Sequence, residues 1–197
     1  MRELNNQCIN TVNGMSKDQD HSRLCGILGI LIYVFYLIGH IPVSEFCYYL
    51  RDTYSFAVYQ YYILLTGKSL LMLLIVWLVW QLKTTQKRLQ KTGLWLIFLL
   101  GVGYFYHDLI VFDIEYIHFI QYCSLTVVFF QALKKRYWIA LLLSLGLGFL
   151  DELYQAYHPS GPLNWRDVLL NVLGVVAGGL VLLTVEKNKH QSEIEIE

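Results

Sequence analysis

Long runs of apolar residues, separated by short polar segments, recur along the whole chain. Crossing the hydrocarbon core of a bilayer takes about 20 mostly apolar residues in a helix. The candidate spans, with bounds good to a few residues, are Leu24–Ile41, Tyr61–Leu82, Leu94–Val111, Ile117–Leu133, Tyr137 to about Tyr157, and about Asn164 to Val185. The fourth is short, and the fifth is long enough only if its helix continues through Asp151 and Glu152. Because polar and apolar residues do not alternate as in barrel strands, the pattern predicts an all-α bundle of about six transmembrane helices.

The lysines and arginines between these runs predict the orientation of the chain. The N-terminal tail has 3, the successive loops have 1, 4, 0, 3 and 1, and the C-terminal tail has 2. Since cytoplasmic loops carry an excess of Lys and Arg, this alternation places both termini in the cytoplasm. The expected organisation is a cytoplasmic polar tail over residues 1–23, a six-helix transmembrane domain over 24–185 and a cytoplasmic tail over 186–197.

Composition supports a membrane protein and excludes other classes. Hydrophobic residues make up 56% of the chain and charged residues only 15%, which excludes a disordered chain. Lys+Arg and Asp+Glu are both 15, so no net positive charge points to nucleic acid as a partner. The four cysteines, at 8, 25, 47 and 123, have no metal-site spacing, and only Cys47 is expected outside. We therefore expect no disulfide, metal or other cofactor.

The first outer loop, Pro42–Gln60, is rich in tyrosine and phenylalanine. Aromatic rings favour the headgroup layer of a membrane. We therefore expect this loop to lie along the membrane surface as a short interfacial helix. Binding of a lipid or sugar by these rings is the alternative interpretation.

Polar side chains within the predicted spans gather in the outer halves of the helices. They are Lys68, His107, Asp108, His118, Asp151, Glu152, Gln155, Asp167 and Asn171. Burying a charged group in hydrocarbon costs about 2.5–3.5 kcal/mol on insertion scales unless it is paired or faces water. This distribution therefore predicts a polar pocket that opens to the outer leaflet.

Spacing brings several of these residues onto shared helix faces. Asp151 and Gln155 are four residues apart, and Glu152 and Gln155 are three apart, so each pair can share a face. Asp167, Asn171, Gly174 and Gly178 follow at intervals of four, three and four, and the two glycines form a G-x-x-x-G motif. The turn His158–Pro162 would join the last two spans as an antiparallel hairpin, so that their polar ends meet.

Most of these residues also have a structural interpretation. The glycines favour helix packing, Asn171 an interhelical hydrogen bond, and Lys68 an outward-reaching side chain. His107 and Asp108 are typical of a solvated helix end, whereas both interpretations of His118 stay open. For Glu152 a functional role is favoured. Two adjacent carboxylates cannot share one face, so Asp151 and Glu152 are expected to differ in role.

These motifs resemble the signature of the VanZ-like membrane protein family. The resemblance covers about 115–180. It includes Asp151-Glu-Leu-Tyr-Gln155, Arg166-Asp-Val-Leu-Leu-Asn171, Gly174 and Gly178. His118-Phe119 followed by Tyr122 resembles a second block of the family, which begins His-Phe-x-x-Tyr. Members often carry Asp-Lys just upstream of that His, where this chain has Ile114 and Glu115.

The resemblance implies a protein of the bacterial cell envelope. The founding member of the family is linked to low-level resistance to the glycopeptide antibiotic teicoplanin. The resemblance marks His118, Glu152, Gln155, Asp167 and Asn171 as family-typical polar positions and assigns them no reaction.

Three functions are compatible with the sequence. The first is a non-enzymatic envelope protein that binds membrane lipids, lipid-linked envelope precursors or a membrane protein partner through its polar pocket. The second is a membrane enzyme acting on a lipid headgroup or lipid-linked cell-wall precursor, with Glu152 and His118 as the acid–base pair. In it Asp151, Gln155, Asp167, Asn171, Lys68, Arg166 and Tyr122 would line the site. The third is a small transporter or scramblase, which would need a polar path continuing toward the cytoplasm.

Overall fold

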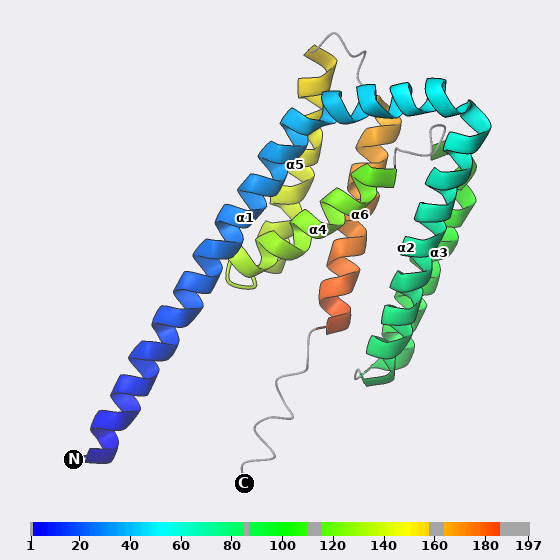
Figure 1. The fold of residues 1–197 in the computed structure, drawn as a ribbon. Coiled ribbons are helices and arrows are strands. Elements are labelled where there is room, and N and C mark those ends of the chain that lie inside the picture. The colour runs from blue at the N-terminus through cyan, green and yellow to red at the C-terminus, as the bar shows by residue number, and fades with distance from the viewer. Residues whose placement is uncertain (1, 85–86, 110–115, 158–163, 186–197) are drawn as a thin grey trace.

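The computed structural model describes residues 2–84, 87–109, 116–157 and 164–185, and the regular secondary structure of this part is all α-helical (Figure 1). The helices are α1 (Arg2–Tyr54), α2 (Phe56–Thr84), α3 (Arg88–Leu109), α4 (Tyr116–Ala132), α5 (Tyr137–Tyr157) and α6 (Trp165–Val185). The predicted turn over 158–162 and the positions 113–115 upstream of His118 lie outside the described residues.

Four segments are long and apolar enough to cross a membrane: Gln19–Gly39, Phe56–Lys83, Tyr137–Tyr157 and Trp165–Val185. The fifth predicted span is confirmed as a single helix that continues through Asp151 and Glu152. The outward sides of α1 and α2 carry many exposed leucine, isoleucine, valine and phenylalanine side chains. Exposed apolar surface on this scale is unusual for a soluble monomer and typical of a membrane-embedded protein.

The first helix is much longer than the apolar run that predicted it. It begins at Arg2 and ends at Tyr54, so it includes the expected polar tail and most of the expected first loop. The tail has no proline to stop a helix, and Pro42 lies within α1, which changes direction before it runs across one end of the molecule (Figure 1). Ser55, with φ of 70°, then separates α1 from α2.

The core of the molecule lies between α4, α5 and α6, with α1 packed against α4 (Figure 1). Tyr122 and Leu125 of α4 and Val175 of α6 are among its most deeply buried side chains. The helices α2 and α3 lie side by side and join this core through α6, where Trp95 Nε1 donates a hydrogen bond to Thr184 Oγ1 at 2.9 Å. The described core therefore uses the C-terminal half of the chain, with support from α1.

A tight turn connects α4 to α5. Lys134 and Lys135 both have positive φ, and Lys135 N donates to Phe130 O at 2.8 Å. The turn folds α5 back along α4, so that the beginning of α4 comes close to the last turns of α5. It thereby brings His118 close to the carboxylates of α5.

Candidate functional site

Polar side chains from three helices meet at the end of the bundle where α5 ends and α6 begins. His118 lies in the first turn of α4, Asp151 and Glu152 lie in the last two turns of α5, and Asn171 lies in the second turn of α6. Together with Tyr122 of α4 we call these five residues the polar cluster. Each is 3% exposed or less, so the cluster is enclosed by protein. The sequence had predicted a pocket that opens to the outer leaflet.

Asn171 makes hydrogen bonds to two other helices. Its Nδ2 donates to Glu152 Oε1 at 3.1 Å and to Gly148 O at 3.2 Å. Its Oδ1 lies 3.1 Å from His118 Nδ1. In this orientation of the amide, the Nδ1–H of the imidazole donates to Asn171, which leaves Nε2 as the acceptor of the ring.

The Asp151 carboxylate is held by Tyr122 through one oxygen and also interacts with the Gln155 side chain. Tyr122 Oη donates to Asp151 Oδ2 at 3.2 Å and also lies 3.4 Å from Leu147 O. The second oxygen, Oδ1, is buried and accepts no hydrogen bond from any described residue. Gln155 lies beside Asp151, one turn further along α5. The two adjacent carboxylates thus have different partners, as expected from their positions on the helix.

The first helix supplies two tyrosines that the sequence did not indicate as site residues. Tyr36 Oη lies 3.1 Å from both ring nitrogens of His118, and the two rings meet edge to face. Tyr33 Oη donates to Leu147 O at 3.2 Å, beside the Tyr122 hydroxyl. Tyr33 and Tyr36 are three residues apart, and this shared helix face in an apolar run was the available signal.

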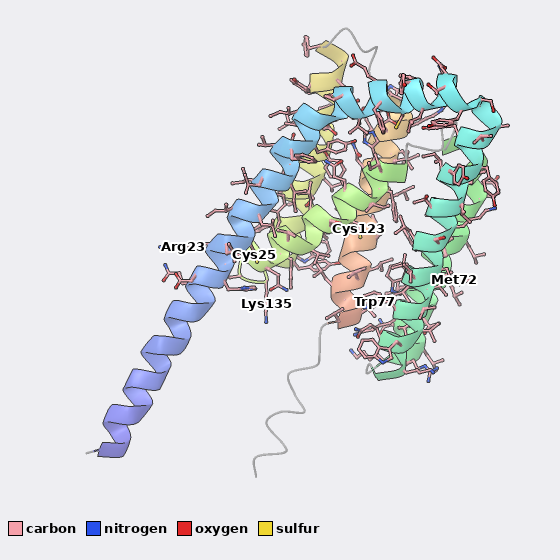
Figure 2. The ribbon with its side chains drawn as sticks, viewed as in Figure 1. Arg23, Cys25, Met72, Trp77, Cys123 and Lys135 are labelled. Carbon is pink, nitrogen blue, oxygen red and sulfur yellow. The ribbon has the colours of Figure 1, made fainter. Side chains whose placement is uncertain are left out.

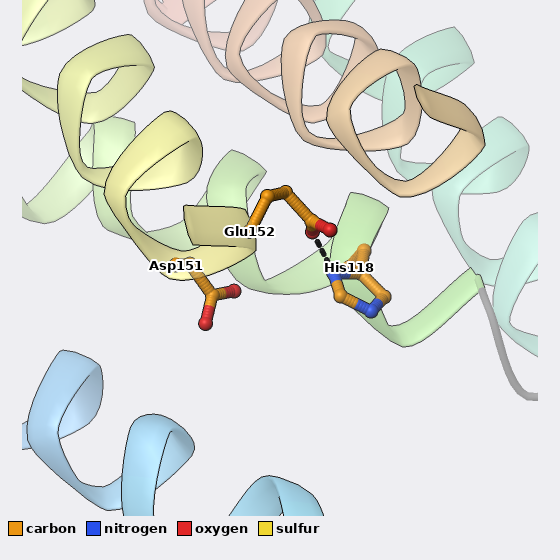
Figure 3. Close-up of side chains that lie close together, drawn as sticks. All are labelled: His118, Asp151 and Glu152. Atoms are coloured by element: carbon orange, nitrogen blue, oxygen red, sulfur yellow. Dashed lines mark ion pairs between the residues drawn. The ribbon is translucent and has the colours of Figure 1, made fainter. Parts of the chain in front are cut away.

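The imidazole and the two carboxylates lie close to one another (Figure 3). His118 Nδ1 is 3.7 Å from Glu152 Oε1, and one donor atom from each of His118, Asp151 and Glu152 lies within 4.8 Å of the others. Side chains of these types can bind a metal ion or exchange protons. The sequence predicted no metal site because the three residues come from two separate segments.

Other predicted site residues lie at the edge of the cluster or away from it. Asp167 accepts a hydrogen bond from Asn164 Nδ2 at 2.9 Å, and its charge acts on Glu152 from the first turn of α6. Arg166 is exposed, and its backbone N–H donates to Asn164 Oδ1. The Asn164 side chain thereby caps the start of α6. Lys68 is exposed in the middle of α2. The side chains of His107 and Asp108 lie outside the described part.

Gly174 and Gly178 lie where α6 touches α4. A Cβ atom at Gly174 would be 2.5 Å from Phe119 O, and one at Gly178 would be 2.8 Å from Cys123 O. Gly148 of α5 plays a similar part, since a Cβ there would be 3.1 Å from the Asn171 side chain. The small residues let the three helices approach closely enough for Asn171 to reach both His118 and Glu152.

Among the described residues, the acidic groups of the cluster have no lysine or arginine to balance their charge, and His118 is their basic neighbour. Neither Asp151 nor Glu152 forms an ion pair with a lysine or arginine among the described residues, and the salt-bridge partner of Glu152 is His118. Burying two uncompensated carboxylates costs far more free energy than burying neutral groups. Their charge must therefore be balanced by protons or by a bound cation.

A small apolar cavity adjoins the cluster between α5 and α6. Its volume is about 170 Å³, and it is lined by Leu145, Gly148, Phe149, Val168, Asn171 and Val172. Because Asn171 belongs to both, the cavity reaches the polar cluster from the side of the bundle. Such a space suits a hydrocarbon segment rather than a polar molecule.

No protein-family model matches this chain, and neither a curated protein nor a solved structure is significantly similar to it.

Proposed function

We propose that this protein is a VanZ-like membrane protein of the bacterial cell envelope, with six spans and both termini in the cytoplasm. The ends of α2 and α6 and the start of α1 lie toward one end of the molecule (Figure 1). Lys83 and Lys87 flank that end of α2, and Lys135 lies near the height at which α6 ends, with Arg23 above it (Figure 2). This distribution supports the orientation that the positive-inside rule predicts.

In this orientation the polar cluster lies in the extracytoplasmic half of the membrane. We propose that it binds the headgroup region of a membrane lipid or lipid-linked envelope precursor, and that this contributes to glycopeptide (teicoplanin) resistance. The observation that carries the proposal is the convergence of His118, Glu152 and Asn171, which are three of the positions on which the family resemblance rests. The cavity beside Asn171 would accommodate part of a lipid chain.

An enzyme acting on the same class of molecule is the second candidate. It is favoured by the 3.7 Å separation of His118 Nδ1 and Glu152 Oε1, because two groups that exchange protons must act on one substrate. Glu152 would serve as general acid or base and His118 as the second proton-transfer group. Asn171 would orient both, since it is bonded to each of them. No comparable observation favours a transporter, because the buried titratable side chains described are confined to this end of the bundle.

The test is Glu152→Gln, which keeps the shape of the side chain and removes its charge. We expect the wild-type protein to retain a lipid in native mass spectrometry and to confer a teicoplanin phenotype. The variant should reach wild-type abundance in the membrane and lose both. Glu45→Gln, at an exposed position of α1, is the matched control and should behave as wild type. Loss of folded protein in detergent in parallel with the phenotype would instead make Glu152 a structural residue.

A further inference from the structure

We propose that His118, Asp151 and Glu152 bind one divalent transition-metal ion of the Zn²⁺ or Mn²⁺ type between α4 and α5. The inference concerns the same cluster as the proposed function, and the purpose of the ion rests on that function. The binding itself is a separate property that can be measured without any phenotype.

The spacing of the donor atoms is close to that of a coordination shell. Nitrogen and oxygen ligands lie about 2.0–2.2 Å from zinc, so that neighbouring ligands are about 3–3.5 Å apart. His118 Nδ1 lies 3.7 Å from Glu152 Oε1 and 3.1 Å from Asn171 Oδ1. A carboxylate oxygen of Asp151 completes the group within 4.8 Å. Closing these atoms around an ion would shorten the His118–Glu152 separation by a few tenths of an ångström and the separations from Asp151 by up to about 1.5 Å. Metal binding would also move the imidazole proton from Nδ1 to Nε2, beside Tyr36 Oη, so that Nδ1 and Asn171 Oδ1 could both act as ligands.

The unbonded oxygen of Asp151 is the second observation that points to a ligand. Asp151 is fully buried, and Oδ1 has no hydrogen-bond partner among the described residues. Figure 3 shows the Asp151 carboxylate near the Glu152 carboxylate and the His118 ring, and one donor atom of each lies within 4.8 Å of the others. A buried carboxylate oxygen without a donor is costly, and coordination to a cation would remove that cost.

Charge balance favours a divalent ion in particular. Two ionised carboxylates and a neutral imidazole carry a charge of −2, which one divalent cation neutralises in a site that no lysine or arginine enters among the described residues. Tyr122 holds Asp151, as the partners of metal-binding carboxylates commonly do. An imidazole nitrogen with carboxylate oxygens selects Zn²⁺ or Mn²⁺ over Ca²⁺ and Mg²⁺, which prefer oxygen ligands alone.

A cation would also explain how an acidic cluster serves a lipid ligand. Two carboxylates repel a phosphate group, whereas a divalent ion with an open coordination position attracts one. The chemical class that fits the loaded site is therefore a phosphate-bearing lipid headgroup.

The experiment is a measurement of metal content in full-length protein purified in detergent without a polyhistidine tag. The protein is stripped with a chelator, incubated with Zn²⁺ or Mn²⁺ alone, desalted and analysed by plasma mass spectrometry. The parent should carry His21→Ala and Cys25→Ser, because this exposed pair, 3.7 Å apart, is a competing zinc site. We expect about one equivalent of metal, and an affinity at least about tenfold weaker in Asp151→Asn and Glu152→Gln. Asp52→Asn, at an exposed position, should retain full binding.

Absence of bound metal from the parent protein, or equal binding by the parent and both site variants, would overturn the proposal. If the variants do not fold, X-ray absorption of the zinc-loaded parent decides, because only nitrogen and oxygen ligands are expected and a sulfur ligand contradicts the site. The two proposals fail separately. Loss of the phenotype in Glu152→Gln without any metal binding leaves the proposed function standing, and metal binding without a phenotype leaves the cation site standing.

Discussion

Asn171 is the residue on which the geometry of the cluster depends most. One amide group bonds to the imidazole of α4, to the carboxylate of Glu152 and to the backbone of α5 at Gly148. A hydroxyl or carboxylate in its place would lack either the two donors or the acceptor that these partners require. The sequence predicted an interhelical hydrogen bond for Asn171. Its three partners depend on the distances between helices, which spacing along one helix does not specify.

Asn171→Leu tests this arrangement, because leucine has the same branched arrangement of heavy atoms and no polar atom. The change leaves His118, Glu152 and Gly148 O without a shared partner, at a cost of about 1–3 kcal/mol for each buried polar group left unsatisfied. Interhelical hydrogen bonds in membranes average only about 0.6 kcal/mol, so the loss for each group should lie near the lower end of that range. We expect a lower unfolding temperature in detergent. Gln90→Leu, on the exposed side of α3, should change it little.

At the level of helices, the contact between α4 and α6 positions the cluster. Gly174 brings α6 against the backbone of α4 one turn after Asn171, so any side chain there would push the helices apart. Because Phe119 follows His118 directly, a shift at this contact would also move the imidazole. The glycines therefore act on the site through the distance between two helices.

Gly174→Ala and Gly146→Ala make a matched pair for this idea. The added methyl group at Gly174 meets backbone atoms of α4, and such overpacking costs about 1–3 kcal/mol. At Gly146 nothing lies within 4 Å, so alanine should leave stability unchanged or raise it slightly. Thermal unfolding of the two variants in the same detergent compares them directly. Equal behaviour would mean that α4 and α6 are not in close contact in the membrane.

The sequence predicted the helices of the C-terminal half of the chain better than it predicted their packing. The apolar runs indicated α5 and α6 with bounds within a residue of those observed, since length and hydropathy decide whether a segment forms a membrane helix. The site was predicted only in part. Tyr36 was missed because a tyrosine in an apolar span looks like an interfacial residue, and its contact with His118 depends on how α1 crosses α4. The enclosure of Glu152 likewise comes from packing, which hydropathy does not report.

At the scale of the whole molecule, α2 provides the clearest test of topology. It has 29 residues, and at 1.5 Å per residue it is about 43 Å long, which exceeds the roughly 30 Å hydrocarbon core. In the proposed topology its two ends lie on opposite sides of the membrane. Ser55, at the α1–α2 junction, should face outward, and Lys87, after the far end of α2, should face the cytoplasm.

Single-cysteine variants check this assignment in intact cells. In a background in which Cys8, Cys25 and Cys47 are replaced by serine and Cys123 by alanine, Ser55→Cys should react with a membrane-impermeant maleimide. Lys87→Cys should react only after the cells are permeabilised. The loop between α2 and α3 is flanked by Lys83 and Arg88, and loops rich in Lys and Arg stay in the cytoplasm. Labelling of Lys87→Cys but not Ser55→Cys would reverse the orientation. The polar cluster would then lie at the cytoplasmic side, and an outer-leaflet ligand would no longer be able to reach it.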